Sequence, residues 1–102
     1  MRPIHLARLD KVRPVLVLTR SQVRARLTSV TIAPITTTRR GIVSEVLVGP
    51  DNGLDRASVV SLDNVTTIEV ERLGRRIGGL RADQEQELVA ALHLAYDLPS
   101  AY

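Results

Sequence analysis

The sequence predicts a mainly β protein with α, a small antiparallel barrel that carries one C-terminal helix. Short β-branched and aliphatic runs alternate with turn signals at intervals of about ten residues, as in small all-β domains. Near residue 82 the apolar spacing changes to the three-and-four interval of an amphipathic helix. A chain of 102 residues is enough for one hydrophobic core, so we expect a single domain over residues 1–102.

Three strands are expected in the first half of the chain. Residues 15–19 form an apolar run introduced by a proline, whose fixed φ suits the start of a strand. Residues 29–33 alternate apolar and polar side chains, and Pro34 is expected to interrupt the ladder. Residues 42–48 form the third strand, and residues 49–53 are dense in turn formers and predict a loop.

Further strands are expected in the second half. Residues 58–62 and 65–70 are rich in Val, Ile and Thr, and Asp63 and Asn64 between them tolerate a tight turn or bulge. Residues 75–78 are a weaker strand candidate.

The last expected element is a helix over residues 82–98, which Pro99 ends. Acidic residues lie near its start, where the helix dipole favours them. The apolar stripe expected on this helix consists of Leu88, Val89, Leu92, Ala95 and Tyr96.

Composition excludes several classes of site. The chain has no cysteine, so it has neither disulfides nor cysteine-ligated zinc. The two histidines, His5 and His93, lie far apart and lack ligand spacing, and the sequence has no phosphate-binding glycine-rich loop or Gly-x-Ser-x-Gly elbow. We therefore expect no metal and no cofactor. Membrane-spanning and secretory apolar segments are also missing, which predicts a cytoplasmic protein.

Positive charge is concentrated in the first part of the sequence. Residues 1–40 carry nine Lys and Arg against one Asp, a net charge of +8, whereas residues 41–102 carry a net charge of −5. This asymmetry indicates a polyanionic partner, unless the charges interleave in the folded chain. Phe and Trp are absent, so the core must be aliphatic and any stacking on bases must use arginine planes.

Three blocks of sequence occur in an order that is typical of one family. Arg13-Pro14 precedes the first apolar run, residues 30–36 read Val-Thr-Ile-Ala-Pro-Ile-Thr, and residues 58–68 form the third block. With this order and spacing, the sequence from about Arg13 to Leu94 resembles the MazF/PemK family of toxin endoribonucleases. It is most similar to the shortened MazF toxins of mycobacterial type.

The resemblance implies an SH3-like β-barrel of the CcdB/PemK type that acts as a homodimer. Such toxins cleave single-stranded RNA at short sequence motifs without metal or ribosome, and a MazE-like antitoxin neutralises them. The family's catalytic arginine and threonine match Arg13 and Thr36. The ribose 2′-OH attacks the phosphodiester, which leaves 2′,3′-cyclic phosphate and 5′-OH ends. A guanidinium suits the charge that builds on the phosphoryl oxygens, and a hydroxyl can bind the phosphate or position the 2′-OH.

Polar residues around this pair are further candidates for RNA binding, although each also suits a turn or a solvated surface. They are Asp10, Lys11, Thr37, Thr38, Arg39, Arg40, Asp63 and Asn64. The general base is left open, because Arg8 stands where some family members have Glu, and Asp10 is a candidate substitute. Two other classes stay open: a non-enzymatic gyrase-poisoning toxin of the same fold, and an RNA- or protein-binding barrel.

Overall fold

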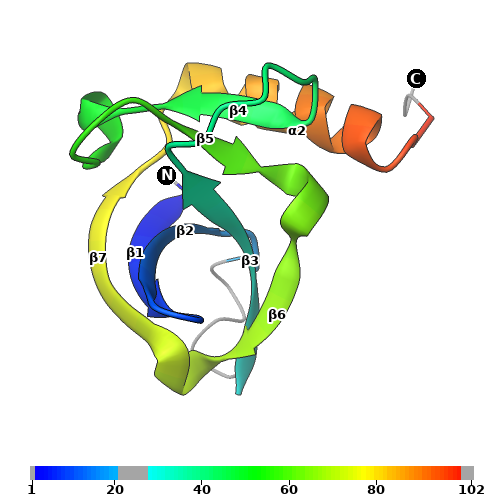
Figure 1. Cartoon of the computed structure of the whole chain (residues 1–102). Helices are drawn as coiled ribbons and strands as arrows, with labels where there is room; N and C mark the ends of the chain where they lie inside the picture. The colour runs from blue at the N-terminus through cyan, green and yellow to red at the C-terminus, as the bar shows by residue number, and fades with distance from the viewer. Residues whose placement is uncertain (1, 21–27, 100–102) are drawn as a thin grey trace.

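The computed structural model describes residues 2–20 and 28–99, and Figure 1 shows the course of the chain. Its elements are, in order, β1 (Pro3–Arg8), β2 (Val12–Val17), β3 (Ser29–Thr36), β4 (Glu45–Val48), the 3-10 turn η1 (Pro50–Asn52), β5 (Ser58–Ser61), η2 (Leu62–Asn64), β6 (Thr66–Glu69), η3 (Val70–Arg72), β7 (Leu73–Gly79) and the helix α2 (Ala82–Ala95). No helix in these ranges combines the length and the apolar character needed to cross a membrane.

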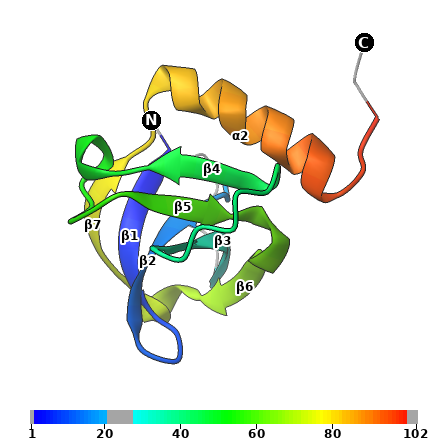
Figure 2. The same ribbon diagram turned by 45° about the horizontal axis from the view of Figure 1, so that its top comes forward.

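The strands form one antiparallel sheet in the order β4-β5-β3-β2-β1-β7, and β6 pairs with β3 beside this path. The sheet curls into an open barrel, and α2 crosses its end next to β4 (Figures 1 and 2). A mainly β fold with one C-terminal helix, as the sequence predicted, is therefore confirmed.

Alternating side chains of the central strands build two aliphatic clusters. Leu16 of β2 faces the larger cluster, which includes Leu62 and Leu88 and lies under α2. Val15 and Val17 point to the opposite face and belong to the smaller cluster inside the curl of the sheet. This alternation follows from the period-two geometry of a strand. Both clusters consist of Val, Leu, Ile and Ala, so the expected aliphatic core is confirmed.

Strand β3 continues through Pro34, contrary to the expectation that this proline interrupts the ladder. On one side Pro34 is paired with Val15 of β2. On the other side the ladder to β6 ends at Ile32 and the ladder to β5 begins at Ile35. Because Pro34 lies between these two partners, the strand tolerates its missing N–H.

Strand β4 begins at Glu45 and is shorter than the expected strand over residues 42–48. The Glu45 carboxylate accepts hydrogen bonds from the backbone N–H groups of Arg40, Gly41 and Ile42. These bonds fold residues 40–44 into a loop. Ile42 and Val43 are therefore exposed loop residues, although their apolar side chains suggested a strand.

The last two strands of the sheet order, β1 and β7, also differ from the expectation. Strand β1 was not predicted, and it pairs with both β2 and β7. Strand β7 spans seven residues, longer than the weak candidate over 75–78. The whole strand curves along β1, from the Ala7–Leu73 pair to the Pro3–Gly79 pair (Figure 1).

Helix α2 packs on the barrel with most of the expected stripe, since Leu92 and Ala95 contact the larger cluster and the Tyr96 hydroxyl donates to the carbonyl of Leu62. Leu88 is buried as predicted, but Val89 is 54% exposed, and Gln84 is buried together with Ala91. Gln84 tolerates burial because its amide is fully used. Its Oε1 accepts from the Arg81 N–H and from Asn52 Nδ2, and its Nε2 donates to the carbonyl of Leu47.

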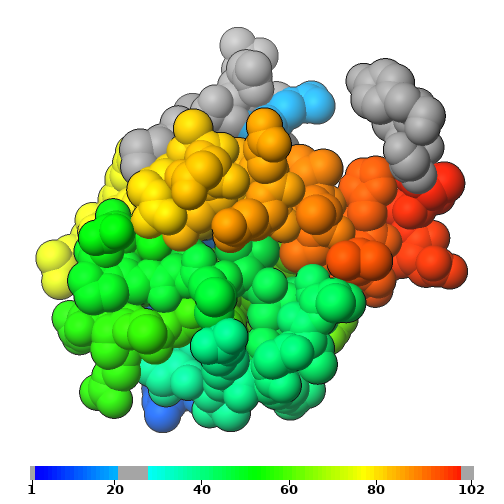
Figure 3. Space-filling model, turned by 90° about the horizontal axis from the view of Figure 1, so that it is seen from above, coloured from blue at the N-terminus to red at the C-terminus, as the bar shows by residue number. Residues whose placement is uncertain are grey.

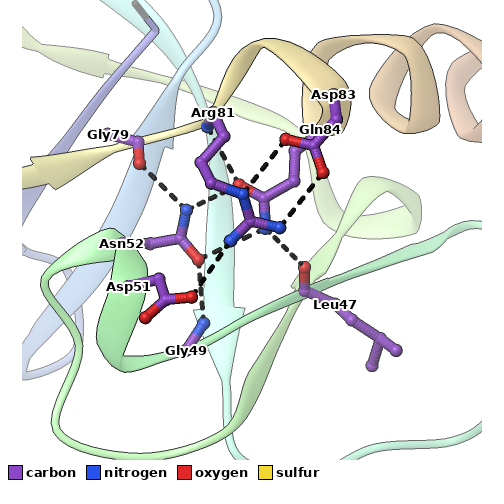
Figure 4. Close-up of polar contacts among 8 residues, drawn as sticks. All are labelled: Leu47, Gly49, Asp51, Asn52, Gly79, Arg81, Asp83 and Gln84. Atoms are coloured by element: carbon purple, nitrogen blue, oxygen red, sulfur yellow. Dashed lines mark hydrogen bonds and ion pairs between the residues drawn. The ribbon is translucent and has the colours of Figure 1, made fainter.

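The Asn52–Gln84 pair joins η1, the end of β7 and the start of α2, as Figure 4 shows. Asn52 Nδ2 also donates to the carbonyl of Gly79 at 3.0 Å, and Asn52 Oδ1 accepts from the N–H of Gly49. Next to this network the backbones of Asn52-Gly53 and Gly78 are in direct contact. A Cβ built on Gly78 would lie 1.7 Å from the carbonyl oxygen of Asn52.

We predict that Gly78→Ala destabilises the fold by about 3 kcal/mol, because the added methyl forces β7 and η1 apart. Gly49→Ala is the matched control, since its Cβ would meet only the Cα of Ala57 at 3.8 Å. For the control we expect a change of less than about 1 kcal/mol. Urea unfolding followed by circular dichroism measures both variants, and equal midpoints would contradict this account.

Candidate active site

The two candidate catalytic residues lie on neighbouring strands. Strands β2 and β3 pair Val17 with Ile32 and Val15 with Pro34. Carrying this register two residues further aligns Arg13 with Thr36. Since residues two apart on a strand share a face, both positions belong to the face that carries Val15 and Val17. The extended register thus relates two backbone positions that are 23 residues apart in the sequence.

Arg13 is held by an acidic residue of its own hairpin. Its Nε donates to Asp10 Oδ1 at 2.9 Å and its Nη2 donates to Oδ2 at 3.1 Å, a two-point pairing of guanidinium and carboxylate. This contact lowers the pKa of Asp10 from its ordinary value of 3.8 to about 2 and raises the pKa of Arg13. Lys11 lies between them in the same hairpin and is exposed.

Thr36 ends β3, and its hydroxyl is oriented by the chain that follows. Its Oγ1 accepts a hydrogen bond from the N–H of Thr38 at 3.1 Å. A hydroxyl that accepts in this way keeps its own proton available for donation. Thr36 is half-buried, so the geometry presents one positioned donor at the end of the strand.

The other basic candidates follow Thr36 in the loop before β4. Thr37, Thr38, Arg39 and Arg40 are all exposed. Glu45 fixes the second half of this loop through the N–H groups of residues 40–42. A cavity of about 330 Å³ lies beside Thr37 and Arg39, against the ends of β4 and β5.

Asp63 and Asn64 lie in η2, and Asp63 is bonded to the loop before β4. Asp63 Oδ2 accepts a hydrogen bond from Ser44 Oγ at 2.7 Å, and Asn64 Nδ2 donates to Ser61 Oγ at 2.8 Å. Both side chains are exposed, and each makes a hydrogen bond to a neighbouring serine, as polar residues in a turn commonly do.

The structure gathers the candidates into two connected groups. The first group comprises Asp10, Lys11 and Arg13 on the β1–β2 hairpin, and the register of β2 with β3 aligns it with Thr36. The second group consists of residues 37–40, which follow Thr36 in the chain, and of Asp63, which Ser44 connects to their loop. Asn64 is bonded instead to Ser61. Sequence reasoning missed Glu45 and Ser44, because nothing in their local sequence indicates that they hold the loop.

Comparison with known proteins gives the family. The sequence model of the PemK-like, MazF-like toxins of type II toxin-antitoxin systems matches residues 4–96. Endoribonuclease MazF3 of Mycobacterium tuberculosis is 60% identical over 98 residues, which cover 96% of this chain and 95% of the relative.

Solved structures agree with this assignment. The Mycobacterium tuberculosis toxin MazF-mt6 superposes with a TM-score of 0.95 at 58% identity, over 97% of this chain and all of that one. An endoribonuclease in complex with its cognate antitoxin, from a mycobacterial species, gives a TM-score of 0.85 at 26% identity and covers 96% of this chain and 94% of that chain. From the extent of these matches, the chain belongs to the PemK-like, MazF-like toxins of type II toxin-antitoxin systems.

Proposed function

We propose that this toxin is a sequence-specific endoribonuclease that cleaves single-stranded RNA at the Arg13–Thr36 pair. The observation that supports the proposal is the β2–β3 register, because extending it two residues beyond the Val15–Pro34 pair puts the backbone positions of Arg13 and Thr36 opposite each other. These are the two positions that match the arginine and threonine implied by the family resemblance. Its relative at 60% identity is named an endoribonuclease, which supports the same activity.

In the proposed reaction the ribose 2′-OH attacks the adjacent phosphorus and the bond to the 5′ oxygen breaks. The products are a 2′,3′-cyclic phosphate and a 5′-OH. Arg13 binds the phosphoryl oxygens with two parallel N–H groups, and it binds more strongly as negative charge builds on them. Thr36 donates its free hydroxyl proton to the phosphate and orients the attacking group.

Asp10 is assigned to positioning Arg13. With a pKa of about 2 its carboxylate is ionised at neutral pH but is a weak proton acceptor, because a general base works best when its pKa lies near the operating pH. Its two hydrogen bonds instead fix the plane of the guanidinium before RNA arrives. The contact is replaced when a phosphate takes the same donors.

The proposal includes a homodimer, a MazE-like antitoxin and a cytoplasmic location, where RNA is found. Strand β4 and helix α2 lie side by side (Figure 2) and expose apolar side chains, among them Leu47, Val89 and Leu94. Figure 3 shows this face, on which the C-terminal part of α2 projects past the sheet. Exposed apolar residues on adjoining elements support self-association.

We predict that the purified protein cuts a long unstructured RNA in the presence of EDTA at discrete positions. Analysis of the product ends should show 2′,3′-cyclic phosphate and 5′-OH groups. Arg13→Ala should lower the cleavage rate by about 100-fold or more, because it removes the donors for the phosphate. Thr36→Val, which keeps the shape but not the hydroxyl, should lower the rate by about tenfold or more.

The matched controls are Arg20→Ala and Thr66→Val, which remove the same groups from exposed positions elsewhere. Both should keep wild-type rates. Intact RNA with the folded wild-type protein would reject the nuclease function, and full activity of Arg13→Ala would reject the assigned residue.

The Asp10–Arg13 contact makes a separate prediction about titration. Because the pKa of Asp10 is lowered, the ion pair is intact at neutral pH and is lost only as the pH falls toward about 2. In Arg13→Ala the pKa of Asp10 should return to near its ordinary 3.8. NMR titration of the Asp10 carboxyl carbon measures this shift, with Arg20→Ala as the control. An unchanged pKa in Arg13→Ala would show that the pair does not form in solution.

The antitoxin is expected to be an acidic chain that covers the basic surface around Thr36 and Arg39. Adding the cognate antitoxin in excess should abolish RNA cleavage, and Arg39→Gln together with Arg40→Gln should weaken its binding. Calorimetric titration at two salt concentrations measures the affinity. Undiminished cleavage in the presence of bound antitoxin would contradict a shared surface.

A further inference from the structure

We propose that a second cavity, enclosed by β1, β2, β7 and the loop over residues 53–58, binds one unstacked nucleobase of the RNA, with Arg56 and Arg75 as its contacts. The inference rests on the proposed nuclease function and adds a specificity site to it. Neither arginine belongs to the catalytic pair or to the polar residues that surround it.

The cavity has the size and lining of a base-binding site. Its volume is about 330 Å³, near the lower end of the range for ligand pockets. Leu6, Leu54 and Ile77 supply apolar walls, and the polar groups of Asp55, Arg56 and Arg75 line it with them. An apolar interior with a few polar groups suits a flat base that is taken out of its stack.

The cavity lies at the same ends of β2 and β3 as the candidate catalytic residues. Pro14 and Thr37 both line it, and they are the chain neighbours of Arg13 and Thr36. Successive side chains of a strand point to opposite faces, so Pro14 places the cavity on the face of β2 opposite to Arg13. A strand of RNA whose phosphate is held by Arg13 reaches the cavity by crossing the ends of β2 and β3, which places a flanking base there.

The walls of the cavity are held rigidly. Gly53 approaches β7 so closely that a Cβ on it would lie 2.0 Å from the carbonyl oxygen of Ile77. Asn52, the preceding residue, is 2% exposed and is bonded to Gly79 and Gln84 (Figure 4). These contacts fix the loop that carries Leu54 and Arg56 before a ligand arrives, which reduces the entropy lost on binding.

The charged side chains at the cavity are suited to contact a base. In the described ranges the ion pairs occupy Arg2, Arg13 and Arg81, and none involves Arg56 or Arg75. Their guanidinium planes are thus available to stack on a base, a role that the absence of Phe and Trp leaves to arginine. The Asp55 carboxylate, which also lines the cavity, can accept hydrogen bonds from the amino and imino groups of a base.

The test is cleavage of short RNA oligonucleotides that span one mapped cut site, with each flanking nucleotide in turn made abasic. For the wild type, one abasic position should lower kcat/KM by about tenfold, the loss expected when one stacked base is removed. In the double variant Arg56→Gln/Arg75→Gln, the intact oligonucleotide should be cleaved about tenfold more slowly, and that abasic position should cause no further loss.

Two further variants make the result specific. Arg20→Gln removes one exposed charge three residues beyond the end of β2 and should keep the wild-type abasic profile. Arg56→Lys/Arg75→Lys keeps the charges but not the planes, so it should lose the abasic penalty as the glutamine variant does. Thermal unfolding confirms that each variant is folded.

The outcomes separate this site from the function on which it rests. An active wild type whose abasic profile is unchanged in both double variants overturns the base site and leaves the nuclease function standing. An inactive wild type overturns the nuclease function, and the base site with it.

Discussion

The change of partners along β3 is the constraint on which the fold and the site both depend. One edge of β3 follows β2, while the other edge pairs with β6 up to Ile32 and with β5 from Ile35. Pro34 lies where the partner changes and donates no hydrogen bond there. The sheet can therefore curl at this point, and beyond it Thr36 pairs with Val59 of β5.

Two carboxylates organise the surface around that end, and each acts on a different part of the chain. Asp10 holds the side chain of Arg13, whereas Glu45 holds the backbone of residues 40–42. A basic surface made only of arginines would repel itself in the absence of RNA. Internal carboxylates reduce that repulsion and also impose a defined geometry.

The sequence was informative wherever local pattern and burial agree. Strands β3, β5 and β6 follow their β-branched runs, and α2 follows its apolar spacing. Strand β1 was missed because irregularities in its ladder with β7, at residues 4–7, break the alternation of buried positions. The predicted range of strand β4 was too long because the bonds from Glu45 to the preceding loop form only in the folded chain.

For the site, Arg13 and Thr36 were found through the family's motifs, and their alignment depends on strand pairing that no single segment specifies. The same limit applies to Arg56 and Arg75, which share a cavity although 19 residues separate them. Exposed arginines look alike in a sequence, and only their surroundings distinguish a solvated charge from a contact residue.

The Asp10–Arg13 pair also has a consequence for how salt affects RNA binding. Polyelectrolyte theory counts the condensed cations that nucleic acid sheds when protein cations neutralise its phosphates. Here Arg13 is already paired with Asp10, so a phosphate that binds Arg13 displaces the Asp10 carboxylate. The freed carboxylate attracts cations from solution, which offsets part of the cation release from the RNA. The logarithm of RNA affinity will consequently fall less steeply with the logarithm of salt concentration than the number of phosphate contacts implies. At high salt the toxin will therefore bind RNA more tightly than expected from its number of arginines.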